Sequence, residues 1–511
     1  MTWDDIKGAM PVIAPVLAAL AILVRGSARR SGQNPMPPAI ALAGFLFTLI
    51  TIAVAWPVTS RPLFAGALRS DNLGLFAALL STLAGIGTVL ISVDYLKRRG
   101  RNHAEYYALV LFGVTGMSVM GMSSNLLSLL LGLELMSLVL YVLAGFFREE
   151  SRSIESSIKY FLTGSFATGL FLFGMGLVYG ASGSLDLDAL GLALADSHYR
   201  SLALVGVGFL VAGFAFKIAA APFHMWLPDV YEGAPTPVTA FMATGVKIAA
   251  FTAIVRVFSA VYQVDNDSLR SALWWIAVLT MSVGNLAALV QKNVKRMLAY
   301  SAIAHAGYLL VALVAMRGEP DEGGALSFGT SEAARGILYY LLAYLTANLG
   351  AFGVLSHFER EGGKGLDYED LSGLRAKYPF LSLALALFML SLAGIPGTAG
   401  FIGKLLVFGS AVETGAALDR DSFVLLAILG ILNSLVGLYY YLRVLIQLYV
   451  KDLPDTERDR LPVMASPAFG GVIVIAFAAT IWLGVGPDFF HLGLGVEPAL
   501  QMVQQALASL R

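Results

Sequence analysis

The feature that most restricts the fold of this chain is a series of apolar runs, most of them long enough to cross a lipid bilayer. A helix of about 20 apolar residues spans roughly 30 Å of hydrocarbon. Fourteen such runs lie near residues 10–24, 38–56, 73–95, 106–122, 125–147, 158–180, 201–224, 237–262, 269–290, 297–316, 334–357, 379–412, 422–448 and 466–486. Only 13% of the 511 residues are charged, and 57% are hydrophobic. We therefore predict an all-α polytopic membrane protein with about 14 transmembrane helices.

Basic residues predict how these helices are oriented. Lys and Arg are concentrated in the connections that follow odd-numbered helices, for example in residues 97–101, 292–296 and 360–377. By the positive-inside rule these connections are cytoplasmic, so both termini are expected on the outer side. The N-terminus contains Asp4 and Asp5 where a cleaved signal peptide would be basic. We therefore expect the first helix to be retained.

Two of the predicted helices are interrupted. Residues 216–237 read FKIAAAPFHMWLPDVYEGAPTP, and their four prolines predict a break in helix 7 near Pro222. The 33 residues 380–412 would form an unbroken helix about 50 Å long, which exceeds the bilayer. The sequence GIPG at 394–397 is therefore expected to divide helix 12. Interrupted helices in corresponding positions of two units indicate an inverted repeat and a transport pathway.

The predicted spans and breaks divide the chain into four parts. Residues 1–104 contain helices 1–3, and residues 105–262 contain the first five-helix repeat, helices 4–8. Residues 263–449 contain the second, inverted repeat, helices 9–13. Residues 450–511 contain helix 14 and a C-terminal tail.

Three ionisable residues lie well inside predicted spans. Glu134 is about ten residues into helix 5; a neutral carboxyl bonded to a neighbouring helix is the plain alternative to an ion pathway. Lys247 is equally central, and Lys217 lies five residues before Pro222, so snorkelling competes with function at both lysines. The Glu134 carboxylate could pair with Lys217, and its movement would change the proton affinity of that lysine.

Other titratable groups are candidate relay members. His305 lies about eight residues into helix 10 and is either a bonded structural residue or a proton relay. His224 and Asp229 flank the first break, as structural caps or as relay groups. Three basic residues near span ends are expected to snorkel or to bond loops: Lys159, Arg256 and Arg443.

Several function classes are excluded. The chain has no cysteine, so it contains no disulfide, thiolate metal site or cysteine-ligated iron–sulfur cluster. It also lacks a dinucleotide fingerprint, a phosphate loop, an HExxH motif and a nucleophile elbow. A net charge of zero argues against nucleic acid as a partner. Any redox chemistry must therefore lie on another subunit.

Four stretches are specific enough to identify a family: NLLSLLLGLELMSLVLYVLAGF, FKIAAAPFHMWLPDVYEGAPTPVTAFMATGVKIAAF, QKNVKRMLAYSAIAHAGYLLVAL and DLSGLRAKYPFLSLALALFMLSLAGIPGTAGFIGKLLVF. Through them, and over about residues 105–449, the chain resembles the antiporter-like membrane subunits of respiratory complex I, the proton-translocating NADH:quinone oxidoreductase. Among these subunits it is most similar to the subunit N type.

The resemblance implies specific site residues. Glu134 matches the helix 5 glutamate of the family, and Lys217 and Lys247 match its helix 7 and helix 8 lysines. Lys404 matches the helix 12 lysine of this subunit type, where one sister subunit has glutamate.

The resemblance also implies a translocase subunit in the cell inner (plasma) membrane, with other membrane subunits of complex I and the lipid bilayer as partners. No cofactor is expected in this chain, since FMN, iron–sulfur clusters and quinone belong to partner subunits. The nearest alternative is a subunit of a multisubunit sodium/proton antiporter or of a membrane-bound hydrogenase. A scaffold that translocates nothing is a more distant alternative.

Overall fold

The structure is a computed structural model that describes residues 3–27, 36–56, 60–264, 266–320, 326–452, 466–485 and 496–510. The helices in the first half are α1 (Trp3–Ser27), α2 (Met36–Ala55), α3 (Asn72–Arg98), α4 (Ala104–Met122), α5 (Leu126–Ala144), α6 (Ser151–Ser182), α7 (Leu187–Ala195), α8 (Arg200–Ile218), α9 (Trp226–Gly233), α10 (Thr236–Phe241), the π-helical turn η2 (Met242–Val246) and α11 (Lys247–Val261). Those in the second half are α12 (Asp267–Leu289), α13 (Val294–Ala315), α14 (Glu332–Phe358), α15 (Pro379–Ala393), α16 (Ala399–Leu418), α17 (Asp421–Tyr449), α19 (Pro467–Trp482) and α20 (Val496–Leu507). The short elements are the strands β1 (Arg61–Leu63), β2 (Leu68–Ser70), β3 (Glu319–Pro320) and β4 (Leu326–Ser327), and the 3₁₀ turns η1 (Phe64–Gly66), η3 (Glu361–Gly363), η4 (Tyr368–Leu371) and η5 (Leu374–Ala376).

The predicted class is confirmed, because this is an all-α polytopic membrane protein. Within the described ranges, 13 helices are long and apolar enough to cross a membrane. The predicted fourteenth span corresponds to α19, which has only 16 residues. The first helix is longer than the predicted run at 10–24, since α1 has 25 residues.

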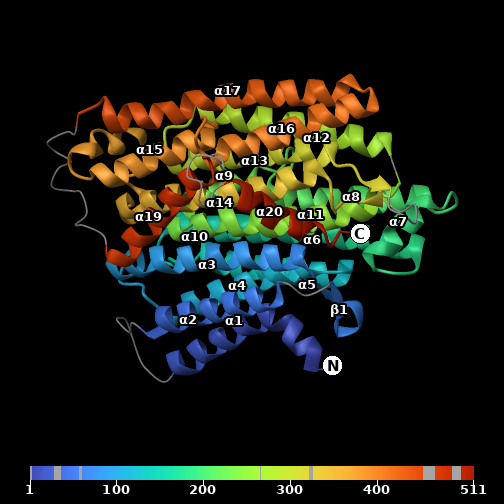
Figure 1. Cartoon of the computed structure of the whole chain (residues 1–511). Coiled ribbons are helices and arrows are strands. Elements are labelled where there is room, and N and C mark those ends of the chain that lie inside the picture. Colours follow the sequence, from blue (N-terminus) through green and yellow to red (C-terminus); the bar gives the residue numbers. More distant parts are fainter. Residues whose placement is uncertain are drawn as a thin grey trace.

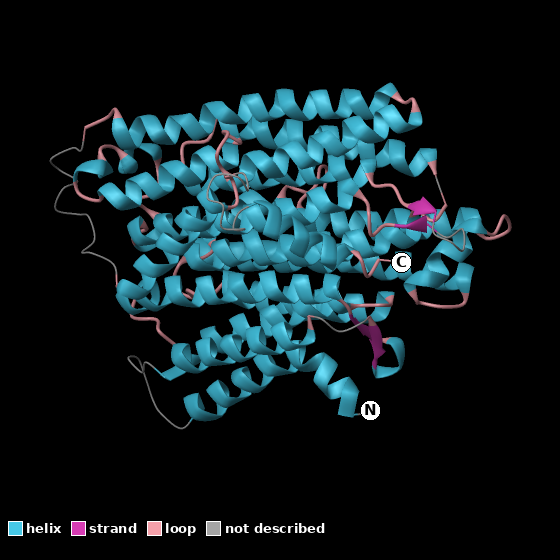
Figure 2. Ribbon diagram, viewed as in Figure 1, coloured by secondary structure: helices cyan, strands magenta, loops and turns pink. Residues whose placement is uncertain are grey.

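The helices lie side by side along one common direction, and both antiparallel two-stranded sheets lie at one end of the bundle (Figures 1 and 2). Figure 1 shows α1 and α2 at one edge and α17 at the opposite edge. The continuous segment α10–η2–α11 and the helices α13 and α14 are almost wholly buried, whereas α6 and α17 are mostly exposed. The core of the protein therefore lies around α10–α11, α13 and α14.

The first break is confirmed and includes Pro222, since α8 ends at Ile218 and α9 begins at Trp226. Helix α8 ends at Ile218, and Ala219 adopts a left-handed conformation with φ 56°. The amide of Ala220 donates to the Ala215 carbonyl at 2.7 Å, which closes the end of the helix. The indole of Trp226 donates to the Phe216 carbonyl at 3.1 Å. These bonds satisfy helix-end carbonyls that would otherwise be unpaired, so the chain leaves the helix before Pro222.

The second break lies where it was predicted. Helix α15 ends at Ala393, and α16 begins at Ala399. Gly394 has φ 86° and Gly397 has φ 86°, a left-handed conformation that glycine adopts at little cost. A Cβ atom at Gly394 would also lie 2.8 Å from the side chain of Lys404. Glycine therefore permits both the turn and the close approach of this lysine.

Candidate functional site

Lys217 lies in the last turn of α8 and is buried. Its Nζ donates to the hydroxyl of Ser137 on α5 at 2.6 Å, and that hydroxyl donates in turn to the Leu133 carbonyl. The rings of Tyr141 and Tyr160 lie 5.9 and 5.6 Å from Nζ. The ammonium group is therefore surrounded by a neutral hydroxyl and aromatic faces.

Glu134 is half-buried on α5 and bonds to a different partner from the one expected. Its carboxylate accepts a hydrogen bond from Thr168 on α6 at 2.5 Å. Among the described residues it forms no ion pair with Lys217, so the structure corrects the direct pairing suggested by the sequence. Glu134 is three residues before Ser137 and therefore lies on the same face of α5 as the hydroxyl that holds Lys217.

Lys247 follows directly after the π-helical turn Met242–Val246. Such turns are rare and often occur at functional sites. Its Nζ donates to the backbone carbonyl of Ala302 on α13 and lies 5.2 Å from the ring centroid of Tyr344 on α14. Lys247 therefore also has a neutral oxygen as its hydrogen-bond acceptor.

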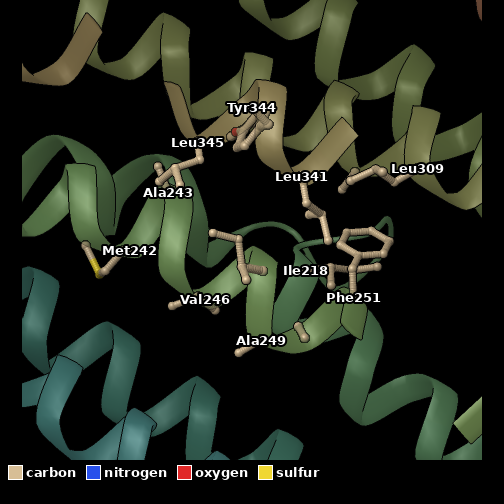
Figure 3. Close-up of a cluster of buried hydrophobic side chains, with 14 of the residues drawn as sticks. Ile218, Met242, Ala243, Val246, Ala249, Phe251, Leu309, Leu341, Tyr344 and Leu345 are labelled. Atoms are coloured by element: carbon tan, nitrogen blue, oxygen red, sulfur yellow. The ribbon is translucent and has the colours of Figure 1, made fainter. Parts of the chain in front are cut away.

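An apolar cluster includes residues close in the chain to Lys217 and Lys247. Figure 3 shows side chains of this cluster contributed by four helices: Ile218 of α8, Phe251 of α11, Leu309 of α13 and Leu341 of α14. Ile218 follows Lys217 in the chain, and Phe251 lies one turn after Lys247. The helices that hold the two lysines therefore pack together through apolar side chains.

His305 is held at both ring nitrogens. Nδ1 is 2.5 Å from the Tyr340 hydroxyl and Nε2 is 2.9 Å from the Tyr441 hydroxyl. The Tyr441 hydroxyl also lies 2.5 Å from Ser301 Oγ. In a neutral imidazole one nitrogen donates and the other accepts. One tyrosine therefore donates to the ring while the other accepts from it, and a change of tautomer reverses both roles.

Aromatic rings connect His305 with the lysines on either side. The His305 ring centroid is 5.3 Å from that of Tyr344, the ring beside Lys247. It is 5.5 Å from that of Tyr308, whose ring centroid lies 5.2 Å from Lys404 Nζ. His305 therefore shares aromatic neighbours with both Lys247 and Lys404.

Lys404 is bound by the broken end of α15. Its Nζ donates to the carbonyls of Leu392 and Ala393 at 2.9 and 2.8 Å and to Ser434 Oγ on α17 at 2.7 Å. These two carbonyls lie at a helix C-terminus, where they lack intrahelical donors and where the helix dipole favours a cation. Three acceptors match the three protons of an ammonium group.

Asp229 lies on α9 in an ion-pair network outside the membrane spans. It accepts from Lys159 at 2.7 Å and from Arg296 at 2.8 Å, and Arg296 also bonds Glu232 at 2.7 Å. Burial opposes its ionisation, but the hydrogen bonds from Lys159 and Arg296 hold the pKa of Asp229 below its ordinary value. Lys159 is therefore an ion-pair partner rather than a residue that only snorkels.

His224 lies in the turn after the first break and is half-buried. Its Nδ1 is buried without a hydrogen-bond partner among the described residues, and burial lowers the pKa of its ring. His224 shares no hydrogen bond or ion pair with Asp229 in this part of the chain. The structure places both residues near the break but does not connect them directly.

Arg256 differs from the expectation that it would snorkel. Its guanidinium is buried and forms two bonds of 2.7 Å with the two carboxylate oxygens of Asp71. It also donates to the Gly121 carbonyl. Arg443 is bound as expected for a residue that bonds a connection, since it donates to the Gln291 carbonyl at 3.1 Å. The Arg256–Asp71 pair links α11 to the start of α3.

Sequence reasoning missed the residues that form hydrogen bonds with the side chains of the candidate site: Ser137, Thr168, Tyr340, Ser434 and Tyr441. Buried hydroxyls are frequent in these helices, and no spacing in the sequence distinguishes these five. No group of three or more His, Cys, Asp or Glu residues that could hold a metal ion occurs among the described residues.

Comparison with known proteins defines the class of protein. The family described as "NADH:quinone oxidoreductase/Mrp antiporter, TM" matches residues 123–430, which include both breaks and the residues Lys217, Lys247 and Lys404. The fold is shared with the membrane-bound sulfane sulfur reductase, an archaeal respiratory membrane complex (TM-score 0.80, 22% identity, 98% of this chain and 97% of that chain), and with the Mrp complex from Dietzia sp. DQ12-45-1b (TM-score 0.78, 19% identity, 100% and 98%).

Relatives with higher identity define the family more narrowly. NADH-quinone oxidoreductase subunit N of Trichlorobacter lovleyi is 40% identical over 493 residues, which cover 96% of this chain and 94% of that protein. The corresponding subunit of Myxococcus xanthus is 44% identical over 435 residues, covering 81% and 82%. A chain of respiratory complex I from Thermus thermophilus with bound aureothin has a TM-score of 0.76 and 35% identity, covering 96% and 99%. The chain belongs to the NADH-quinone oxidoreductase subunit N family.

Proposed function

We propose that this chain acts as an antiporter-like, proton-translocating membrane subunit of an NADH-quinone oxidoreductase. The other membrane subunits of that enzyme and the lipid bilayer are its partners. NADH oxidation and quinone reduction take place on other subunits, which hold FMN, iron–sulfur clusters and quinone. The absence of cysteine from the chain agrees with this division. The enzyme lies in the bacterial plasma membrane, with both termini of this chain on the outer side.

The observation that supports proton transfer is the nature of the lysine partners. Lys217, Lys247 and Lys404 donate only to hydroxyl and carbonyl oxygens in the described structure. A carboxylate in contact with an ammonium group favours the charged lysine. Because these three lysines lack such a contact, no fixed counter-charge holds the proton on them. They are therefore suited to taking up and releasing protons.

The proposed route starts on the cytoplasmic side and uses two units, residues 105–262 and residues 263–449, related as inverted repeats. Protons enter past Asp229 and His224 and load Lys217. Helices 1–3, in residues 1–104, and residues 450–511 flank these units.

The second part of the route runs between the two units. Movement of the Glu134 carboxylate relative to Lys217 changes the proton affinity of that lysine and sends the proton to Lys247. His305 and its two tyrosines connect Lys247 with Lys404. Lys404 then releases the proton to the outer side.

Replacement of Glu134 by Gln tests this proposal. The amide oxygen of glutamine still accepts from Thr168, so assembly is expected to persist while the charge is lost. We expect proton translocation by membrane vesicles to fall about tenfold at equal amounts of assembled complex, because one pKa unit of interaction corresponds to about a factor of 10. Glu149→Gln is the matched control, since Glu149 is exposed and pairs only with Arg101.

Two outcomes would count against the proposal. Wild-type proton translocation by an assembled Glu134→Gln complex would remove Glu134 from the pathway. Translocation that requires sodium ions would favour the sodium/proton antiporter alternative.

A further inference from the structure

A second buried charge cluster lies outside the proposed route. Lys295, near the start of α13, and Glu359, the residue after α14, form an ion pair at 3.2 Å. Their side chains are only 1% and 4% exposed. This lysine therefore differs from Lys217, Lys247 and Lys404, because it is in contact with a carboxylate.

The ion pair holds one corner of the backbone. Lys295 Nζ donates to the Ala234 carbonyl at 2.5 Å, and the amide of Thr236 donates to Glu359 at 3.3 Å. Ala234 and Thr236 flank Pro235, which joins α9 to α10. Tyr95 of α3 donates to the same carboxylate at 2.7 Å. Polar backbone groups of a buried corner need partners, and this ion pair supplies one acceptor and one donor.

Glu359 is ionised in this setting. Burial raises the pKa of a carboxyl group, but the charge of Lys295 and the hydrogen bonds from Tyr95 and Thr236 outweigh burial and hold the pKa of Glu359 below its ordinary value. The pair also bonds the backbone at Ala234 and Thr236 and the hydroxyl of Tyr95. These contacts are those of a structural link.

This corner begins the helix that contains Lys247. Thr236–Val261 is one continuous, fully buried segment, and Lys247 lies 11 residues, about three turns, after Thr236. Helix α13 bonds both this segment and the corner that precedes it, since Lys295 donates to the Ala234 carbonyl and the Ala302 carbonyl accepts from Lys247. The first contact sets the position of the helix start, and the second is the hydrogen bond of the proposed proton carrier.

We propose that Lys295 and Glu359 are positioning residues that keep Lys247 in register with the Ala302 carbonyl and thereby permit proton transfer through Lys247. This inference rests on the proposed function. Loss of the pair removes the bonds that hold the backbone of residues 234–236. The start of α10 then shifts, and Lys247 moves away from the Ala302 carbonyl. A misplacement of about 1 Å far from the reacting groups can slow a reaction on the order of a hundredfold.

The test compares single variants of the complete complex in membrane vesicles, measuring protons translocated per NADH oxidised. Lys295→Met should lower this ratio by about tenfold in assembled complex. Lys295→Arg should restore most of it, because arginine keeps the charge and the donors. Lys292→Met, at an exposed lysine three residues away, should leave the ratio unchanged. If Lys295→Met does not assemble, Glu359→Gln, which keeps an acceptor oxygen, is expected to lower the ratio in its place.

A wild-type ratio in assembled Lys295→Met or Glu359→Gln complex would overturn the inference. An equal loss in Lys295→Arg and Lys295→Met would also overturn it, because arginine cannot release a proton and the result would make Lys295 a carrier. Lys247→Ala separates the two proposals. Full proton translocation by Lys247→Ala would contradict the proposed function. If Lys247→Ala loses translocation while Lys295→Met and Glu359→Gln keep it, only the positioning role is contradicted.

Discussion

The hydroxyl of Tyr340 offers the sharpest test of the proposed connection between Lys247 and Lys404. In Tyr340→Phe the ring remains, and only the oxygen 2.5 Å from His305 Nδ1 is removed. A buried donor or acceptor left without a partner costs about 1–3 kcal/mol. If about 1.4 kcal/mol of that cost adds to the activation free energy of proton transfer through His305, the transfer rate decreases about tenfold. We therefore expect about tenfold slower proton translocation with a normal amount of assembled complex.

The neighbouring residue provides the matched control. Tyr339 is also buried, but its hydroxyl bonds the Leu483 carbonyl and not His305. Tyr339→Phe thus removes the same atom from the same helix and leaves His305 unchanged. The assay follows acidification of inverted membrane vesicles with a pH-sensitive dye, together with NADH oxidation and the amount of assembled complex.

The same comparison can be made on the other side of the ring. Tyr441→Phe removes the partner of Nε2, whereas Tyr440→Phe removes a hydroxyl that bonds Asn285. The reasoning is refuted if Tyr340→Phe and Tyr441→Phe pump as well as their neighbouring controls. In that case His305 would be a bonded structural residue.

Two further predictions concern the lysines. Lys217→Arg should assemble but pump about tenfold less or worse, because arginine stays protonated at accessible pH; pumping equal to wild type in vesicles would show that Lys217 is a fixed charge. Lys404→Ala should block proton translocation, because it removes the exit group. Lys404→Glu should retain part of the translocation activity, because one sister subunit has glutamate at the matching position. Unimpaired pumping by an assembled Lys404→Ala complex would place the exit elsewhere.

Local features explain why the helices and both breaks were predictable from the sequence. Apolar runs specify spanning helices because every backbone polar group in the membrane must be paired within the segment. The GIPG stretch predicted the end of α15 correctly, since glycine permits φ 86° at position 394. Pro222 lies within the first break, between the end of α8 at Ile218 and the start of α9 at Trp226. The bond from Trp226 to the Phe216 carbonyl was not predictable, because it depends on a turn that no local rule specifies.

The sequence by itself determined the class of protein, the series of spans and which ionisable residues are buried, because a charged group inside an apolar run is costly wherever the helix packs. The tertiary structure decided the partners. Glu134 bonds Thr168 rather than Lys217, and Arg256 binds Asp71, which lies 185 residues away in the chain. The reason is that the lipid-facing and protein-facing sides of these helices are both apolar, so periodicity does not reveal which face meets which neighbour. Only the packing of α10–α11, α13, α14 and α16 brings Lys247, His305 and Lys404 around one set of aromatic rings.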